Sequence, residues 1–324
     1  MKLVWLETDK IRNREEKQLK DTVDKTKIIP LKTIGERFIE GLNNIVFMLQ
    51  LPRLVLLHSI LHSEAIVQGL QVVSRFKEGM NDKALNDILE ELRGRLAEIP
   101  IDEDKVSARY KQVTSPGGVV WANLELERII KAHEQHEKSF LNLIYSAIVW
   151  TWTLFEVVAT DLWETALNVN FDTLGKDALK RISKDYVPLG LEDKPSGKYI
   201  KISYLAEFEY NVRDNVGSIL KRYFDFTSLL GIKNAYNFLF PKSITLEKSL
   251  SNDTPKFLSE DRNLIVHKAG YIDLRYKNLT NTTQSVGEQV NIGENTCDNY
   301  LTATIKTFND MLGCVNSYSE LPPG

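Results

Sequence analysis

Apolar residues recur at helical intervals through the first hundred residues of the chain. Over residues 34–50 they return every three or four positions, a spacing that places them on one face of an α-helix. Pro52 should interrupt this helix, because proline lacks the backbone N–H that a helix interior requires. The pattern resumes over residues 54–76, and residues 83–98 form a third amphipathic segment that ends near Pro100. We therefore predict a helical N-terminal region.

The strongest turn signal of the chain lies at residues 113–119, where a proline and two adjacent glycines follow Val-Thr-Ser. Such clusters interrupt regular structure. We therefore predict a domain joint here. A helical N-terminal region of unknown role would occupy residues 1–118, and a second domain residues 119–324.

Helical patterns continue through the second domain. Residues 139–168 are apolar on nearly all sides, and residues 299–318 predict a closing helix. The aromatic-rich stretch over residues 211–240 predicts one or two helices with a break at Gly231. Prolines and glycines within residues 185–197 indicate a loop. The fold class expected from these patterns is all-α.

The long apolar segment could be mistaken for a membrane span. Residues 139–155 contain no charged side chain, but a bilayer core requires about 20 such residues, and Glu156 and Asp161 follow within the same predicted helix. We predict a buried helix and no membrane contact. One face would pack within its own domain and the other against a second subunit; a core helix that contacts only its own domain is the alternative.

Composition indicates a globular protein. The 324 residues are 43% hydrophobic and carry a net charge of −3, which argues against a strongly basic nucleic-acid binder but leaves room for a local basic cleft. Cys297 and Cys314 show no metal-ligand spacing and favour free thiols in a reducing compartment. The first twenty residues lack the pattern of a secretory signal, so secretion is not expected.

The interval of an arginine, four residues and a histidine occurs three times, and its surroundings differ. Residues 53–58 enclose Leu-Val-Leu-Leu, which indicates a buried helix, and residues 128–133 belong to a charged helical segment. Only Arg262 is followed directly by a polar residue, Asn263, on the way to His267. A histidine can move a proton near neutral pH and an arginine can brace a phosphate, so this third motif suits metal-independent RNA cleavage.

Helix geometry restricts how the motif can act. Positions five apart lie about 140° apart around a helix, so Arg262 and His267 would not share a face in a helix interior. Asn263 and His267, four apart, would. We therefore expect the helix to begin at residues 259–261, with Arg262 in its first turn, where free backbone amides would also favour a bound phosphate.

The sequence around this motif resembles HEPN domains, which are all-helical modules of many bacterial ribonucleases in toxin, antiviral and RNA-processing systems. The Arg-Asn-x-x-x-His pattern and residues 268–273 carry the resemblance. Residues 139–168 are similar to the long first helix of the family, residues 286–292 resemble its short hairpin-like link, and residues 299–318 its closing helix. The resemblance covers roughly residues 138–320 and says nothing about the N-terminal region.

The resemblance implies a C-terminal HEPN-like helical bundle with a short β-hairpin-like link, in which two chains pair so that their motifs face one cleft. It implies an endoribonuclease that acts by 2′-hydroxyl transesterification, with Arg262, Asn263 and His267 as catalytic residues. Glu156 matches an acidic position of some members. We add Lys268 and Arg275 as supporting residues; a mixed, solvated surface is the alternative for the charges around the motif.

Partners and location also follow from the resemblance. RNA would be the substrate, the chain would form a homodimer in a bacterial cytoplasm, and an antitoxin or defence-system protein would be a further partner in a toxin or antiviral role. No cofactor and no metal are implied. The alternative is a non-catalytic HEPN-like module that binds RNA, a nucleotide or a protein as a subunit of a larger assembly, with Arg262 and His267 only anchoring the last helices.

Other histidines and aromatic residues receive structural interpretations. The pairs at residues 58 and 62 and at residues 133 and 136 have no third ligand in sequence, so hydrogen-bonded histidines are favoured over a zinc site. Aromatic residues between positions 210 and 238 follow helical spacing, which favours the core over stacking on bases.

Overall fold

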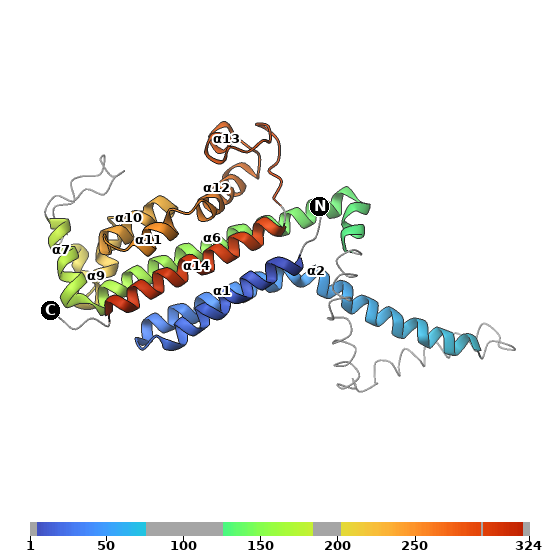
Figure 1. The fold of residues 1–324 in the computed structure, drawn as a ribbon, viewed down its shortest axis with the longest axis horizontal. Helices are drawn as coiled ribbons and strands as arrows, with labels where there is room; N and C mark the ends of the chain where they lie inside the picture. Colours follow the sequence, from blue (N-terminus) through green and yellow to red (C-terminus); the bar gives the residue numbers. More distant parts are fainter. Residues whose placement is uncertain (1–4, 76–125, 184–201, 293, 320–324) are drawn as a thin grey trace. The chain divides into compact units, whose positions relative to one another are not determined.

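The computed structural model describes residues 5–75, 126–183, 202–292 and 294–319. Every regular element in this part of the chain is helical, which confirms the all-α class (Figure 1). The elements are α1 (Trp5–Lys25), α2 (Ile29–Arg75), α6 (Glu134–Val169), the π-helical turn η1 (Phe171–Gly175), α7 (Lys176–Ser183), α8 (Ile202–Ala206), α9 (Val212–Lys221), α10 (Leu229–Leu239), α11 (Ile244–Leu250), α12 (Asp253–Lys268), α13 (Leu274–Thr280) and α14 (Glu294–Ser319).

Contacts between residues divide the chain into two units. Met1–Leu3 and Leu49–Phe140 form one unit, and Val4–Met48 and Leu141–Gly324 form the other. Every candidate catalytic residue belongs to the second unit. The helix predicted over residues 83–98, the joint predicted between residues 118 and 119, and the loop predicted over residues 185–197 lie outside the described residues and stay predictions.

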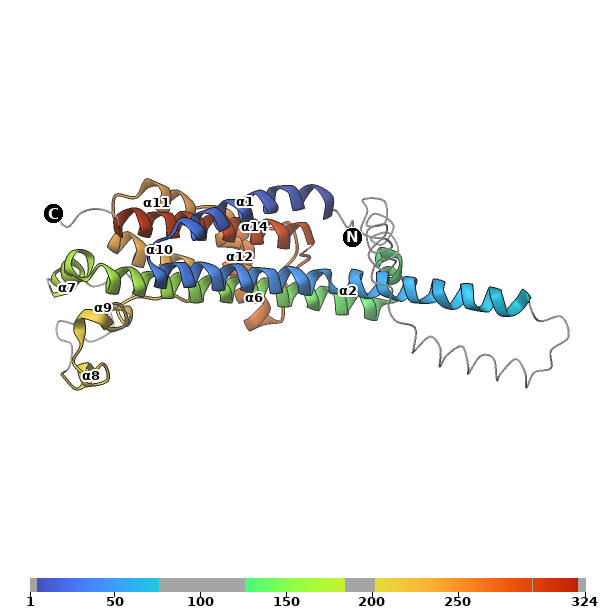
Figure 2. The ribbon, with the colours of Figure 1, turned by 90° about the horizontal axis from the view of Figure 1, so that it is seen from below.

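In the second unit, α1, the first part of α2, α6 and α14 run alongside one another (Figures 1 and 2). Phe38 of α2 packs against Phe308 of α14 with ring centroids 4.1 Å apart. The indole of Trp163 in α6 donates a hydrogen bond to the carbonyl of Ala235 in α10, and Tyr236 of α10 returns one to the carbonyl of Ala159. The apolar stripes predicted from the sequence thus meet in one core.

The long apolar helix is confirmed as α6. By length and composition alone it would suffice to cross a membrane, and 56% of its most apolar window is buried inside the protein. Trp152, Phe155 and Trp163 point into the core, whereas Trp150 is 57% exposed and Val157 is half exposed. The helix therefore fills the core on one side and presents apolar side chains on the other.

Two predicted helix interruptions are wrong. α2 continues through Pro52. Proline removes one backbone hydrogen bond, but the other hydrogen bonds of this long helix hold the segments before and after it together.

The break predicted at Gly231 lies earlier, between α9 and α10. Ser228 caps α10 by accepting a hydrogen bond from the Gly231 amide at 3.1 Å, and a side chain at Gly231 would collide with the Asp225 carbonyl. This glycine therefore serves a close packing contact.

The segment between α13 and α14 pairs with the end of α12. One isolated antiparallel bridge joins Tyr271 and Gln289, and the Val290 amide donates to the Gly270 carbonyl at 2.8 Å. The hairpin-like link predicted over residues 286–292 is therefore a single bridge, and no strand occurs among the described residues. The predicted closing helix is confirmed as α14.

Candidate functional site

The candidate site is built on α12, which begins earlier than the sequence predicted. Asn252 caps the helix by accepting a hydrogen bond from the Thr254 amide at 2.9 Å. Pro255 follows in the first turn, where backbone N–H groups have no partner within the helix. Proline, which lacks this N–H, therefore costs no helical hydrogen bond here. The expected start at residues 259–261 is wrong, so Arg262 lies in the helix interior. The predicted contact of one phosphate with Arg262 and with first-turn amides is lost as well.

A solvent-open pocket of about 240 Å³ lies between the second half of α12 and α13. It is lined by Glu260, Asn263, Leu264, His267, Lys268, Asp273, Arg275 and Tyr276. Four residues singled out from the sequence are thus gathered in one place: Asn263, His267, Lys268 and Arg275. His267 and Lys268 lie in the last turn of α12, and both side chains are exposed. An imidazole in this position is open to a ligand.

Arg262 and Glu156 do not line this pocket. The Arg262 guanidinium is half-buried, and its Nη1 donates a hydrogen bond to Asn263 Oδ1 at 3.0 Å. Its buried Nε has no hydrogen-bond partner among the described residues. Burial raises the pKa of Glu156 on α6, and the positive charge of Arg262 acts in the opposite direction. Arg262 is therefore linked to the pocket through Asn263.

Charges of both signs surround the pocket. Arg275 of α13 pairs with Glu260 of α12 at 3.1 Å, and Asp273 adds a second carboxylate. Lys268 forms no ion pair with any other described residue. Among the described residues, the pocket therefore has one lysine without an ion pair and one arginine paired with a glutamate.

A left-handed turn ends α12 directly after His267 and Lys268. Ala269 has a φ of 52° and Gly270 a φ of 80°, and both amides donate to the Leu264 carbonyl. The Gly270 backbone lies against the buried ring of Tyr145, whose hydroxyl donates to the Val290 carbonyl at 2.8 Å. This contact fixes the end of α12 on α6.

Replacing Gly270 with alanine should destabilise the protein by about 2–4 kcal/mol, because left-handed backbone strain adds to overpacking. A Cβ atom here would lie 2.8 Å from the Tyr145 ring. Urea unfolding measures the loss. Ala269→Gly is the matched control, since it relieves the same backbone region without adding an atom, and it should be neutral or slightly stabilising. Equal stability of Gly270→Ala and the wild type would contradict the close contact.

A buried carboxylate holds α12, α13 and α14 together. Asp261 is 3% exposed and accepts hydrogen bonds from the hydroxyls of Tyr276 on α13 and Tyr300 on α14, both at 2.5 Å. The sequence pattern predicted Asp261 at the entrance of the helix. Its spacing of three from Leu258 and from Leu264, which are both buried, is the signal that marks this face as interior.

The Asp261 carboxyl should make stability depend on pH. Burial raises its pKa more than the two tyrosine hydrogen bonds lower it, and the charge of Glu260 raises it further. Protonation therefore stabilises the fold. This contribution is fully present below the pKa of an exposed aspartate, about 3.9, and is lost as pH rises through the folded value.

Asp261→Asn removes this titration. The difference in unfolding free energy between the wild type and Asp261→Asn should therefore decrease in favour of the variant as pH rises from 4 to 7. Urea unfolding at several pH values measures the difference. A difference that stays constant over this range would show that the carboxyl does not titrate with a raised pKa.

The remaining sequence candidates do not line the pocket. His133 and His136 are exposed, and His136 Nδ1 lies 3.0 Å from the Ile129 carbonyl oxygen. No group of three metal-ligating side chains occurs among the described residues. Cys297 is buried and Cys314 is half-buried, and no disulfide joins them. Tyr236 and Phe238 are core residues, as their helical spacing predicted.

Comparison with models of known protein families, with curated proteins and with solved structures finds no match to this chain.

Proposed function

We propose that the protein is a metal-independent endoribonuclease of the HEPN type that acts as a homodimer. The observation that supports this proposal is the pocket beside α12, which Asn263, His267 and Lys268 line together. The side-chain amide of Asn263 also accepts a hydrogen bond from Arg262. These are the residues of the motif on which the resemblance rests. The biological setting we propose is a bacterial toxin or antiviral system in the cytoplasm, in which an antitoxin or defence-system protein is a further partner.

His267 is the proton-transfer group in this proposal. Its exposed imidazole removes the proton of a ribose 2′-hydroxyl, and the resulting oxygen attacks the adjacent phosphorus. The bond from phosphorus to the 5′-oxygen breaks, and that oxygen takes a proton from the His267 of a second copy. The products are a 2′,3′-cyclic phosphate and a 5′-hydroxyl.

Cationic groups stabilise the charge that builds on the phosphate. Lys268 offers an uncommitted ammonium at the pocket, and Arg275 offers a guanidinium that a phosphate oxygen can share with Glu260. Arg262 holds the Asn263 amide from behind the pocket, and its positive charge acts on the phosphate from there. Glu156 balances the charge of Arg262 inside the protein.

Pocket size and exposed apolar residues support a homodimer. The pocket of about 240 Å³ is smaller than the roughly 300–1,000 Å³ typical of ligand sites, so a second copy would complete the cleft. Val266, next to His267, is about half exposed, and Trp150 and Val157 form an apolar face on α6. Apolar surface of this kind favours association.

A non-catalytic binding module is the second candidate. The ion pair between Arg275 and Glu260, together with Asp273, leaves little net positive charge at the pocket, which favours a protein or a small ligand over a polyanion. The two candidates differ in chemistry, so one experiment separates them.

Incubation of the purified protein with total cellular RNA in EDTA tests the nuclease. We expect discrete new ends that carry 2′,3′-cyclic phosphates. If no new ends form at protein concentrations where the dimer is populated, while the same protein binds RNA in a filter assay, the binding module is the better account. Expression in bacteria adds a second readout, because an active nuclease should slow growth and a binding module should not.

A further inference from the structure

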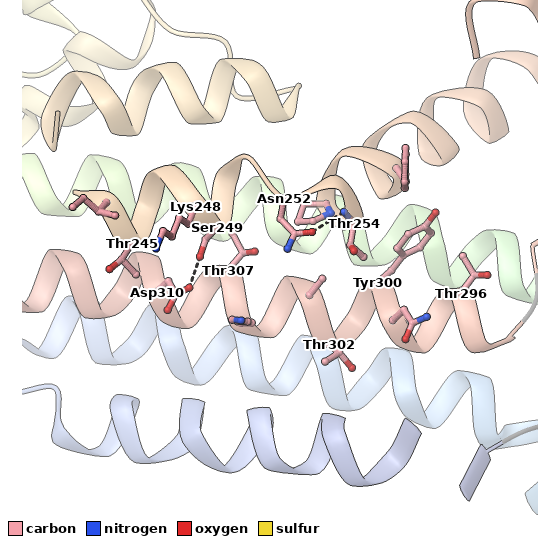
Figure 3. Close-up of a pocket in the computed structure, with 16 residues that line it drawn as sticks. Thr245, Lys248, Ser249, Asn252, Thr254, Thr296, Tyr300, Thr302, Thr307 and Asp310 are labelled. Atoms are coloured by element: carbon pink, nitrogen blue, oxygen red, sulfur yellow. Dashed lines mark hydrogen bonds between the residues drawn. The ribbon is translucent and has the colours of Figure 1, made fainter. Parts of the chain in front are cut away.

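A larger groove lies on the second unit, away from every residue of the proposed catalytic pocket. It has a volume of about 760 Å³ and is bounded by α11, the start of α12 and one face of α14 (Figure 3). This volume falls within the roughly 300–1,000 Å³ typical of small-ligand sites. Threonine, asparagine and lysine side chains line much of it. The groove is therefore suited to a polar ligand.

Thr307 gives the clearest indication of a ligand. Its side chain is 3% exposed and lies on the face of α14 that looks toward α11 (Figure 3). Its hydroxyl forms no hydrogen bond with any other described residue, so it is available to a ligand in the groove. Thr245, Thr254 and Asn299 line the same groove, and their side chains also lack a partner among the described residues. Several groups that can form hydrogen bonds thus line the groove without a partner among the described residues.

Two lysines supply positive charge from opposite sides. Lys248 extends from α11 and Lys306 from α14, and neither pairs with a carboxylate of another described residue. The start of α12 contributes little, because Asn252 already accepts from the Thr254 amide and Pro255 has no N–H. The lysines, rather than a helix end, therefore make the groove attractive to an anion.

Apolar side chains complete the lining. Phe257 and Pro255 of α12 line it, as does Tyr300 of α14, whose hydroxyl is already engaged with Asp261. The aromatic rings suit an apolar face of C–H groups on a ligand, and the hydroxyl and amide side chains suit hydroxyl groups on the same ligand. A phosphorylated sugar combines such a face and hydroxyls with an anionic group for the lysines.

We propose that this groove binds a phosphorylated sugar, with its phosphate between Lys248 and Lys306 and its hydroxyls on Thr307 and Asn299. A free small molecule fits better than a nucleic-acid strand. Asp310 lies at the end of the α14 lining, where it accepts a hydrogen bond from Ser249, and a strand that continued past the lysines would meet this carboxylate. The site is independent of the proposed nuclease activity.

Calorimetric titration of the full chain with ribose 5-phosphate tests the proposal. We expect saturable binding, with ribose and inorganic phosphate each binding about tenfold more weakly because each offers only half of the contacts. Lys248→Gln and Lys306→Gln should each weaken binding about tenfold. Lys256→Gln is the matched control, since Lys256 is an exposed lysine of α12 outside the groove, and it should leave the affinity unchanged.

Thr307→Val separates a binding role from a structural one. Valine keeps the shape and removes the unpartnered hydroxyl, so the melting temperature should stay the same or rise while affinity for ribose 5-phosphate falls. Absence of binding by the wild type at millimolar ribose 5-phosphate, or equal losses in Lys256→Gln and Lys248→Gln, would overturn the proposal. A further outcome is that ribose 5-phosphate does not bind, while a short RNA binds the His267→Ala protein and loses affinity in the Lys248→Gln variant. That outcome would assign the groove to a nucleic-acid strand instead.

Discussion

Replacing His267 with alanine is expected to lower the rate of RNA cleavage by about 10²–10⁴-fold, the usual contribution of a general acid or base. The imidazole is exposed in the last turn of α12 and lines the pocket with Asn263 and Lys268. In a homodimer the substitution removes both copies of the group, so proton removal from the 2′-hydroxyl and proton donation to the leaving oxygen fail together. The loss should therefore lie in the chemical step rather than in RNA binding.

His133→Ala provides the matched control for this experiment. His133 is also exposed and also follows an arginine by five positions, but it does not line the pocket. The His133→Ala variant should therefore cleave RNA at the wild-type rate. Circular dichroism and gel filtration should give the same fold and oligomeric state for both variants. Wild-type cleavage by His267→Ala would remove His267 from the mechanism, and equal losses in both variants would indicate an effect on folding.

Replacing Arg12 with alanine is expected to destabilise the protein by about 3–5 kcal/mol, because it removes the guanidinium that pairs with a buried carboxylate. Arg12 of α1 and Asp298 of α14 are each almost fully buried, and Arg12 Nη1 donates to Asp298 Oδ1 at 2.5 Å. The pair connects residues far apart in sequence within the second unit. Its loss should loosen α1 from α14 and lower the midpoint of urea unfolding.

Two further variants distinguish charge from packing. The double variant Arg12→Met with Asp298→Leu keeps the volume and removes both charges, so its stability should be close to that of the wild type or above it. Arg37→Ala breaks a solvent-exposed pair with Asp161 at 2.8 Å and should cost less than about 1 kcal/mol. If Arg37→Ala proved as costly as Arg12→Ala, burial would not be the source of the effect.

Hydrophobic periodicity was sufficient to predict α6 and α14, but no separate helix was predicted where α1 lies. α6 and α14 carry apolar residues over many turns, and such patterns fit a helix and no other element. Boundaries were less predictable. The start of α12 at Asp253 depends on the Asn252 cap, which resembles many other polar residues in loops, and the continuation of α2 through Pro52 depends on the bonds that a long helix keeps.

Local helix geometry also predicted part of the candidate site. Asn263 and His267 are four residues apart, so any helix through them places both on one stripe, and both line the pocket. Lys268 follows directly at the end of that helix. These relations require only that residues 263–268 be helical, which is why the sequence could determine them.

Tertiary structure decided which charged groups surround that stripe. The charge of Arg262 acts on the pKa of Glu156 on α6, Arg275 is paired with Glu260, and Asp261 is buried under two tyrosines of α13 and α14. The cost of burying a charge depends on neighbours that are distant in sequence, so no local pattern reveals it. The sequence by itself therefore determined the helices and the motif stripe, whereas packing determined the buried carboxylate, the buried ion pair and the lysine-lined groove.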